Sequence, residues 1–264
     1  MKKHCENGLA VAKALEADDR IAWVRYPDLP SDPNYELAKK NDADIVKSDY
    51  YEFLTKENQF RKTGIISRKL VNKIITAKDE PQILKILPSI WSSIYRRSFL
   101  EKNNIRFLET PGASYQDTSF AFKTLSLAEK TAFTVKAYLF YRTDNESSSV
   151  NSSGKVYAIC DEYAEITKFL ETNPKIKEFA NDIKLIKEYD AYFWNAKRVA
   201  PKFRKEFVDK FSEIFKEYEQ KGELTDAFYK KHSRLEINTL LNDKKTYRKI
   251  EKLSMKRVEI RASY

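Results

Sequence analysis

The strongest constraint on the fold is a change in hydrophobic periodicity near residue 156. From there onward, apolar residues recur three and four positions apart, which is the spacing of one helix face. The segments with this spacing are 158–170, 176–199, 202–218 and 224–241, with breaks at Pro174, Pro201 and Gly222. Aromatic residues are frequent in these segments, and such stripes are typical of a packed core. The sequence therefore predicts an all-helical C-terminal region.

The first part of the chain has a mixed pattern. Residues 1–20 have helical spacing, whereas residues 21–26, 44–53 and 131–142 have the composition or alternation of strands. A further helix is expected to start at Tyr35. Because helices and strands alternate, we predict an α/β fold with a mixed sheet. The expected domains are residues 1–154 and, for the helical region with its basic tail, residues 155–264.

Between these strands, residues 51–85 are rich in lysine and carry apolar residues at helical spacing from Ile65 to Ile75. The pattern predicts helices. A basic helical cover would suit a diphosphate substrate, and an ordinary solvated helix face explains the lysines equally well. Both interpretations stay open.

Residues 87–123 are the part of the chain where chemistry is most plausible. Residues 90–100 have the spacing of a short amphipathic helix, and residues 105–108 form an extended run. A turn containing Gly112 follows and leads to Asp117, where the apolar spacing predicts that a new helix begins. The carboxylate of Asp117 would lie near the positive end of the helix dipole, as a cap or as a base.

The order of residues in this stretch resembles that of a known enzyme family. The runs PSIWSSIYRRSFL, NNIRF and ETPGASYQDTSF are similar to the acceptor half of family-two glycosyltransferases, over residues 32–149. The resemblance implies an incomplete GT-A-like (Rossmann-like) fold. It also implies transfer of a sugar from a nucleotide-diphosphate donor to a glycan or lipid-linked acceptor in surface polysaccharide synthesis. The catalytic base would be Asp117.

The same resemblance implies a set of substrate-binding residues. They are Trp91, Arg96, Gln116, Tyr141, Arg142 and Asn145. The last three belong to YRTDNESS, which is similar to the family's Y-R-x-D-N-x-x-S loop. From its charge alone, Arg142 would either balance a phosphate or pair with Asp144.

The N-terminal part departs from the family pattern. Residues 5–21 resemble the helix after the first acidic loop, but neither that loop nor an intact aspartate-rich metal motif is present. Asp28 and Asp32 lie near the place where the family binds Mg²⁺ or Mn²⁺, and the neighbouring prolines also suit two turn acids. A second hypothesis is therefore a catalytically inactive remnant or partner subunit that binds glycan or protein.

Net charge and composition limit the expected cellular location of the protein and the kinds of partner it can bind. The net charge is +10, and the last 21 residues hold eight Lys or Arg against Glu251 and Glu259. This tail would be an interfacial helix on an anionic membrane or a solvated helix, and without a recognisable motif we expect no nucleic acid partner. Two cysteines, no secretory signal and no long apolar run predict a cytoplasmic protein, peripheral at the inner face of the membrane.

Overall fold

The computed structural model describes most of the 264-residue chain. The described residues are 2–22, 24, 26, 29–32, 42–55, 58–109, 115–143 and 156–247. They form two compact units. The sheet unit comprises Met1–Arg106 and Thr124–Glu146, and the helical unit comprises Phe107–Lys123 and Ser147–Tyr264. The predicted α/β class followed by a helical C-terminal region is confirmed.

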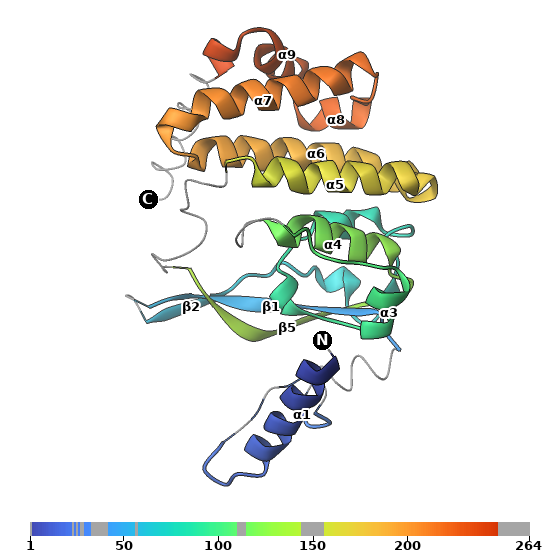
Figure 1. Cartoon of the computed structure of the whole chain (residues 1–264), viewed down its shortest axis with the longest axis vertical. Coiled ribbons are helices and arrows are strands. Elements are labelled where there is room, and N and C mark those ends of the chain that lie inside the picture. Colours follow the sequence, from blue (N-terminus) through green and yellow to red (C-terminus); the bar gives the residue numbers. More distant parts are fainter. Residues whose placement is uncertain are drawn as a thin grey trace. The chain divides into compact units, whose positions relative to one another are not determined.

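The sheet unit is built on two long strands. The strands are β1 (Ile45–Leu54), β2 (Gln59–Lys62), β3 (Ile74–Ile75), β4 (Ser93–Tyr95) and β5 (Thr131–Arg142). Their order is β2-β1-β5-β3, with β4 also paired to β1. β1 and β5 run parallel and lie side by side in Figure 1, whereas the other pairs are antiparallel. The sheet is therefore mixed, as predicted, and β1 and β5 match the strands expected at 44–53 and 131–142.

A small apolar cluster fixes the beginning of these strands. Val46 of β1 and Ala132 of β5 are buried together with Ala43, and Ile94 of β4 packs against them. Before the sheet, the expected N-terminal helix is present as α1 (Lys2–Glu16). The described residues among 21–26 form no strand, so that expectation was wrong, and the helix expected at Tyr35 lies outside the described residues.

Two helix predictions in the sheet unit were wrong. Residues 90–100 form the 3₁₀ turn η3 (Ile90–Ser92), β4 and the short helix α3 (Arg97–Lys102). Pairing of β4 with β1 overrides the helical spacing here, because a ladder to a distant strand outweighs weak local propensity.

The lysine-rich stretch was also predicted as helical. Residues 58–85 instead contain β2, η1 (Arg68–Leu70), β3 and η2 (Pro81–Lys85). Left-handed backbone at Gly64 and Asn72, with φ of 66° and 61°, interrupts any continuous helix. This segment is thus a chain of short elements.

The helical unit follows the predicted breaks closely. It contains α5 (Ala158–Thr172), α6 (Pro174–Arg198), α7 (Pro201–Gln220), α8 (Asp226–Lys231) and α9 (Arg234–Asn242). Pro174 and Pro201 each occupy the first helical position, where proline costs no hydrogen bond. The predicted helix 224–241 is two helices, because the Ser233 hydroxyl accepts a hydrogen bond from Glu236 N and caps α9.

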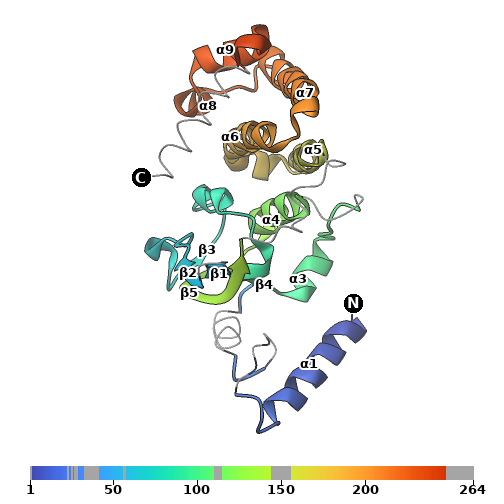
Figure 2. The same ribbon diagram turned by 90° about the vertical axis from the view of Figure 1, so that its left-hand side faces the viewer.

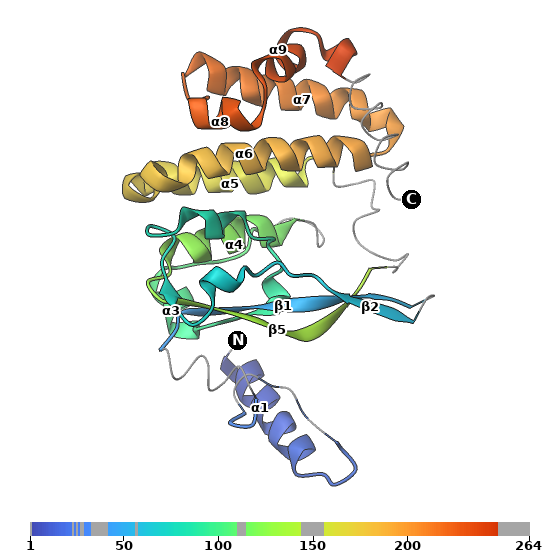
Figure 3. The ribbon, with the colours of Figure 1, turned by 180° about the vertical axis from the view of Figure 1, so that it is seen from behind.

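The helices of this unit enclose an aromatic core. Figures 2 and 3 show α5 and α6 side by side, with α7, α8 and α9 on the other side of α6. The Tyr189 ring packs edge-on against Phe211, Phe215 and Phe228, at centroid distances of 5.1, 5.4 and 5.9 Å. All four side chains are buried. The aromatic stripe of the sequence is thus a packed core.

Candidate functional site

Asp117 lies in the first turn of α4 (Gln116–Leu127), as the sequence predicts. Tyr115, directly before the helix, has left-handed backbone with φ of 60°, and its carbonyl accepts a hydrogen bond from Thr118 N at 2.8 Å. Asp117 is therefore the second residue of the helix and not its cap. It is half-buried, at the end of α4 where the helix dipole favours a negative charge.

The strained residue before α4 is held by α6. The Tyr115 hydroxyl donates to Asn195 Oδ1 at 2.7 Å, and the Asn195 amide donates to Val156 O at 3.1 Å. The Arg198 guanidinium lies 3.9 Å from the centre of the Trp194 ring and donates weakly to the Tyr115 hydroxyl at 3.4 Å. A left-handed non-glycine residue costs about 1 kcal/mol or more and persists where surrounding contacts hold it. These contacts fix the start of α4 and thus the position of Asp117.

A second carboxylate lies at the same end of α4. Glu162 of α5 is fully buried, and its Oε2 accepts a hydrogen bond from Ser119 N at 3.0 Å. Burial raises the pKa of Glu162, the hydrogen bond from Ser119 opposes that rise, and the charge of Asp117 adds to it. Among the described residues, Glu162 Oε1 and Ser119 Oγ have no hydrogen-bond partner.

Two lysines of the helical unit neighbour these acids. Lys123 of α4 pairs with Glu165 at 2.8 Å. Lys187 of α6 is half-buried, and burial lowers its pKa to about 8 while the Asp117 carboxylate acts in the opposite direction. The Asp117 carboxylate therefore interacts electrostatically with the Lys187 ammonium, which loses its proton more readily than an ordinary lysine. Such a pair can keep a carboxylate ionised for proton abstraction.

A separate cluster of predicted residues lies in the sheet unit. Trp91 and Tyr141 are stacked, with ring centres 4.7 Å apart and planes 2° from parallel. Tyr50 meets the Trp91 ring edge-on at 4.5 Å. Trp91 and Tyr141 are both exposed at their edges. Paired rings of this kind present flat apolar surface together with polar tips, which suits the C–H faces of a sugar.

Close to Trp91 in the sequence, the hydroxyl groups of Ser89 and Ser92 surround a buried cation. The Lys47 ammonium donates to Ser89 O and Ser89 Oγ at 3.0 Å, and to Ser92 Oγ at 3.1 Å. Beside it in β1, the buried Asp49 accepts from Ile65 N at 2.7 Å and from the Thr63 hydroxyl at 3.2 Å. The Lys47 bonds hold η3 close to β1, and the Asp49 bonds hold residues 63–65 close to it, which the sequence did not reveal.

The remaining predicted residues are scattered. The Arg96 guanidinium donates to Asp42 at 2.5 Å and to Ala43 O at 3.1 Å, so it ties β4 to the start of β1. Arg142 is exposed at the end of β5, opposite Phe53 of β1. Gln116 donates weakly to Leu108 O at 3.4 Å. Asn145 lies outside the described residues.

The divalent metal implied by the resemblance finds no matching ligand set in the described part of the chain. Asp32 is buried, with its backbone N–H bonded to Leu29 O at 2.9 Å, and Asp28 lies outside the described residues. Within the described ranges, no three His, Cys, Asp or Glu side chains gather as metal ligands would.

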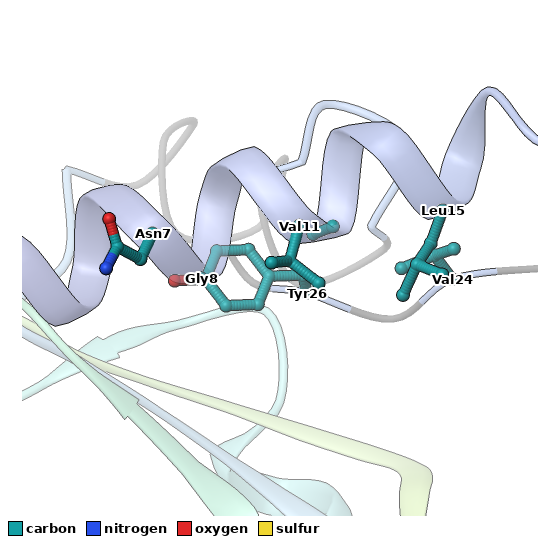
Figure 4. Close-up of a pocket in the computed structure, with 7 residues that line it drawn as sticks. Asn7, Gly8, Val11, Leu15, Val24 and Tyr26 are labelled. Carbon is teal, nitrogen blue, oxygen red and sulfur yellow. The ribbon is translucent and has the colours of Figure 1, made fainter.

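An apolar pocket of about 470 Å³ lies along α1. Figure 4 shows the Tyr26 ring beside Gly8 and Val11, with Val24 near Leu15. A Cβ added at Gly8 would come within 2.7 Å of the Tyr26 hydroxyl, so a larger residue here would displace the Tyr26 ring. Among the described residues that line it, only Asn7 and Tyr26 have polar side chains, and neither is an acid or base in the neutral range.

Glu162, Lys187 and Asn195 are the residues at the α4 end that the sequence analysis missed. Each stands within an apolar helical stripe, between neighbours such as Tyr163 and Ile186 that are buried. A polar residue in such a stripe signals a specific partner, because burying an unpaired polar group is costly. The signal was present in the sequence, but its partners on other elements could not be deduced from spacing.

Comparison with known proteins gives two unrelated similarities. Residues 1–71 match the family described as Cys/Met metabolism PLP-dependent enzyme. Cystathionine gamma-lyase of Rattus norvegicus is 55% identical over 40 residues, which are 15% of this chain and 10% of that enzyme. L-methionine gamma-lyase of Porphyromonas gingivalis is 49% identical over 43 residues, which are 16% and 11% of the two chains.

The second similarity is to a solved structure. The crystal structure of S. aureus TarS 1-349 in complex with UDP-GlcNAc aligns with a TM-score of 0.44 and 15% identity. The alignment covers 68% of this chain and 50% of that one. Because both the TM-score and the sequence identity are low, this similarity does not indicate the function of the present chain.

The match at the N-terminus overlaps a segment with a different predicted resemblance. Residues 5–21, which resemble a glycosyltransferase helix, lie within residues 1–71 that match the PLP-dependent family. The matched stretch spans about a tenth of the lyases, so their activity does not pass to this chain.

Among the described helices, none has both the length and the apolar character required to cross a bilayer.

Proposed function

We propose that this chain contains the acceptor half of a family-two glycosyltransferase, with Asp117 as the catalytic base. The donor would be a nucleotide-diphosphate sugar, and the acceptor a glycan or lipid-linked hydroxyl in surface polysaccharide synthesis. The observation that carries the proposal is the setting of Asp117. It is half-buried in the first turn of α4, within the field of Lys187, in the motif that resembles the family's base.

In this proposal Asp117 takes the proton from the acceptor hydroxyl as that oxygen attacks the anomeric carbon with inversion. The bond from that carbon to the diphosphate oxygen breaks, and the nucleoside diphosphate leaves with the electron pair. The α4 dipole and Lys187 favour the ionised carboxylate before the reaction. Tyr115, fixed by Asn195, holds the carboxylate's backbone in place. In the sheet unit, the stacked rings of Trp91 and Tyr141 supply a surface for a sugar ring.

The proposed partners follow from this chemistry. They are the nucleotide-sugar donor, the glycan or lipid-linked acceptor and an anionic membrane at its cytoplasmic face. Because the described residues supply no metal ligand set, we expect weak donor binding.

The experiment that tests the proposal is a donor panel. The chain is mixed with several nucleoside-diphosphate sugars and acceptors, with Mg²⁺ or Mn²⁺, and release of nucleoside diphosphate is measured together with calorimetric binding. We expect slow release with one donor and binding weaker than micromolar. Micromolar binding that depends on metal would contradict the expected weak donor site, and no release with any donor would contradict catalysis.

A second candidate is a non-catalytic chain that binds a glycan or another protein. It is favoured by the match of residues 1–71 to an unrelated family, where a complete glycosyltransferase would place donor contacts. Binding of an oligosaccharide without release of nucleoside diphosphate would support it.

A further inference from the structure

One face of the sheet carries an aromatic and basic patch outside the site described above. In the strand register, Tyr51 stands opposite both Lys62 and Phe140, and Phe53 stands opposite both Phe60 and Arg142. Residues opposite each other share a face of a sheet, and so do residues two apart on one strand. This set is called the aromatic sheet face. It consists of Tyr51, Phe53, Phe60, Lys62, Phe140 and Arg142.

Two phenylalanines of this face are largely in solvent. Phe60 is 62% exposed and Phe140 is 59% exposed. Tyr51 and Phe140 are stacked at 5.0 Å, and Phe60 meets them edge-on at 5.9 and 5.6 Å. The rings therefore form one cluster and not scattered single contacts. A contiguous apolar cluster that is exposed to solvent is typical of a surface that binds a protein or a membrane.

The exposed charges of the aromatic sheet face are positive, and the one acid two residues before Tyr51 on β1, Asp49, is buried. Lys62 and Arg142 are both exposed, and the Lys62 ammonium is 3.9 Å from the buried Asp49. Glu52 belongs to the opposite face, where it accepts from Arg61 at 2.7 Å. Exposed phenylalanines bordered by cations are complementary to an anionic bilayer, which takes the rings into its apolar layer and attracts the cations.

We infer that the aromatic sheet face docks on an anionic lipid bilayer. The inference rests on the proposed function only in naming the surface for its membrane partner, and it requires no catalysis, so vesicle binding can fail or succeed independently of sugar transfer. Phenylalanine has no polar tip, so the Phe60 and Phe140 rings suit acyl chains better than sugar hydroxyls. Pairing of the β2 edge with a second copy is disfavoured, because β2 has four residues and two of them are cations.

Co-sedimentation of the full chain with lipid vesicles tests this inference. One set of vesicles contains phosphatidylcholine with phosphatidylglycerol, and the other contains phosphatidylcholine alone. We expect binding to the anionic set only, weakened by salt. Phe60→Thr/Phe140→Thr, which keeps β propensity, should weaken binding by about tenfold or more. Lys62→Gln should weaken it by about fivefold.

Two matched controls separate this surface from others. Leu235, 77% exposed on α9, gives the apolar control Leu235→Gln, which should bind like the unmodified chain. Lys252→Gln/Lys256→Gln gives the charge control in the tail. The melting temperature of each variant verifies folding, and each single phenylalanine variant should show part of the loss.

Each of three results would overturn the inference. One is that the unmodified chain does not sediment with anionic vesicles. Another is that the folded phenylalanine and Lys62 variants bind as tightly as the unmodified chain, whether or not the tail variant loses binding. Equal loss in the Leu235→Gln control would also overturn it, because the effect would then not belong to this face.

Discussion

One cluster of aromatic residues in each unit shows opposite uses of these side chains. In the helical unit, Phe211, Phe215 and Phe228 are fully buried around Tyr189. In the sheet unit, Phe60 and Phe140 are mostly exposed, although they too contact other rings. Residue type alone therefore does not separate packing from recognition. Burial does, because a ring already removed from water has no further apolar surface to offer a partner.

The charged residues show the same contrast. Lys184 and Glu188 of α6 pair at 2.7 Å with side chains only 2% exposed, and both contact the Tyr218 hydroxyl. In the sheet unit, Lys62 keeps its ammonium in partial contact with solvent. The Lys184–Glu188 pair stabilises the helical unit from within, whereas Lys62 can also interact with an anion outside the molecule.

The sharpest test of this contrast compares two phenylalanines. Phe215→Ala removes a fully buried ring and should lower the free energy of unfolding by about 3–5 kcal/mol. Phe140→Ala removes a mostly exposed ring and should cost less than about 1 kcal/mol. Denaturant unfolding, followed by probes in each unit, measures both. Similar losses for the two variants would remove the distinction between the units.

The buried ion pair gives a somewhat smaller effect. Glu188→Ala leaves the Lys184 ammonium buried without its carboxylate and should cost about 3 kcal/mol. Lys184→Met/Glu188→Leu should recover most of that loss, since neither charge then remains. The same unfolding assay applies. If the double variant is less stable than Glu188→Ala, the ion pair stabilises the fold by more than the cost of burying its two charges.

Local patterns were enough to predict much of this organisation. Neighbours in sequence determine several features that were predicted correctly. They are β1, β5, the breaks at Pro174 and Pro201, and the start of a helix at Asp117. Segment 90–100 could not be predicted, because its conformation depends on Lys47 and on the pairing with β1, more than 40 residues away. For the same reason spacing could not reveal that Glu162 and Lys187 neighbour Asp117.

The smallest predicted effect concerns pH. The pKa of Glu162 is raised in the folded chain, so the folded state binds its proton more tightly than the unfolded state. This contribution to stability is complete below the ordinary glutamate pKa and is lost as the pH rises through the raised value. Glu162→Gln keeps an acceptor for Ser119 N and removes the titration. The melting temperature of the variant should fall less between acidic and neutral pH than that of the unmodified chain, and an identical fall would contradict the assignment.

The turnover of Asp117→Asn tests the proposed base most directly. Asparagine keeps the size of the side chain in the first turn of α4 and removes its basicity, and loss of the dipole interaction should cost only about 0.3–1 kcal/mol of stability. With the donor that the unmodified chain uses, we predict a loss of about 100-fold or more in turnover at a nearly unchanged melting temperature. Near-full transfer by a folded Asp117→Asn variant would contradict the role of Asp117 as the base.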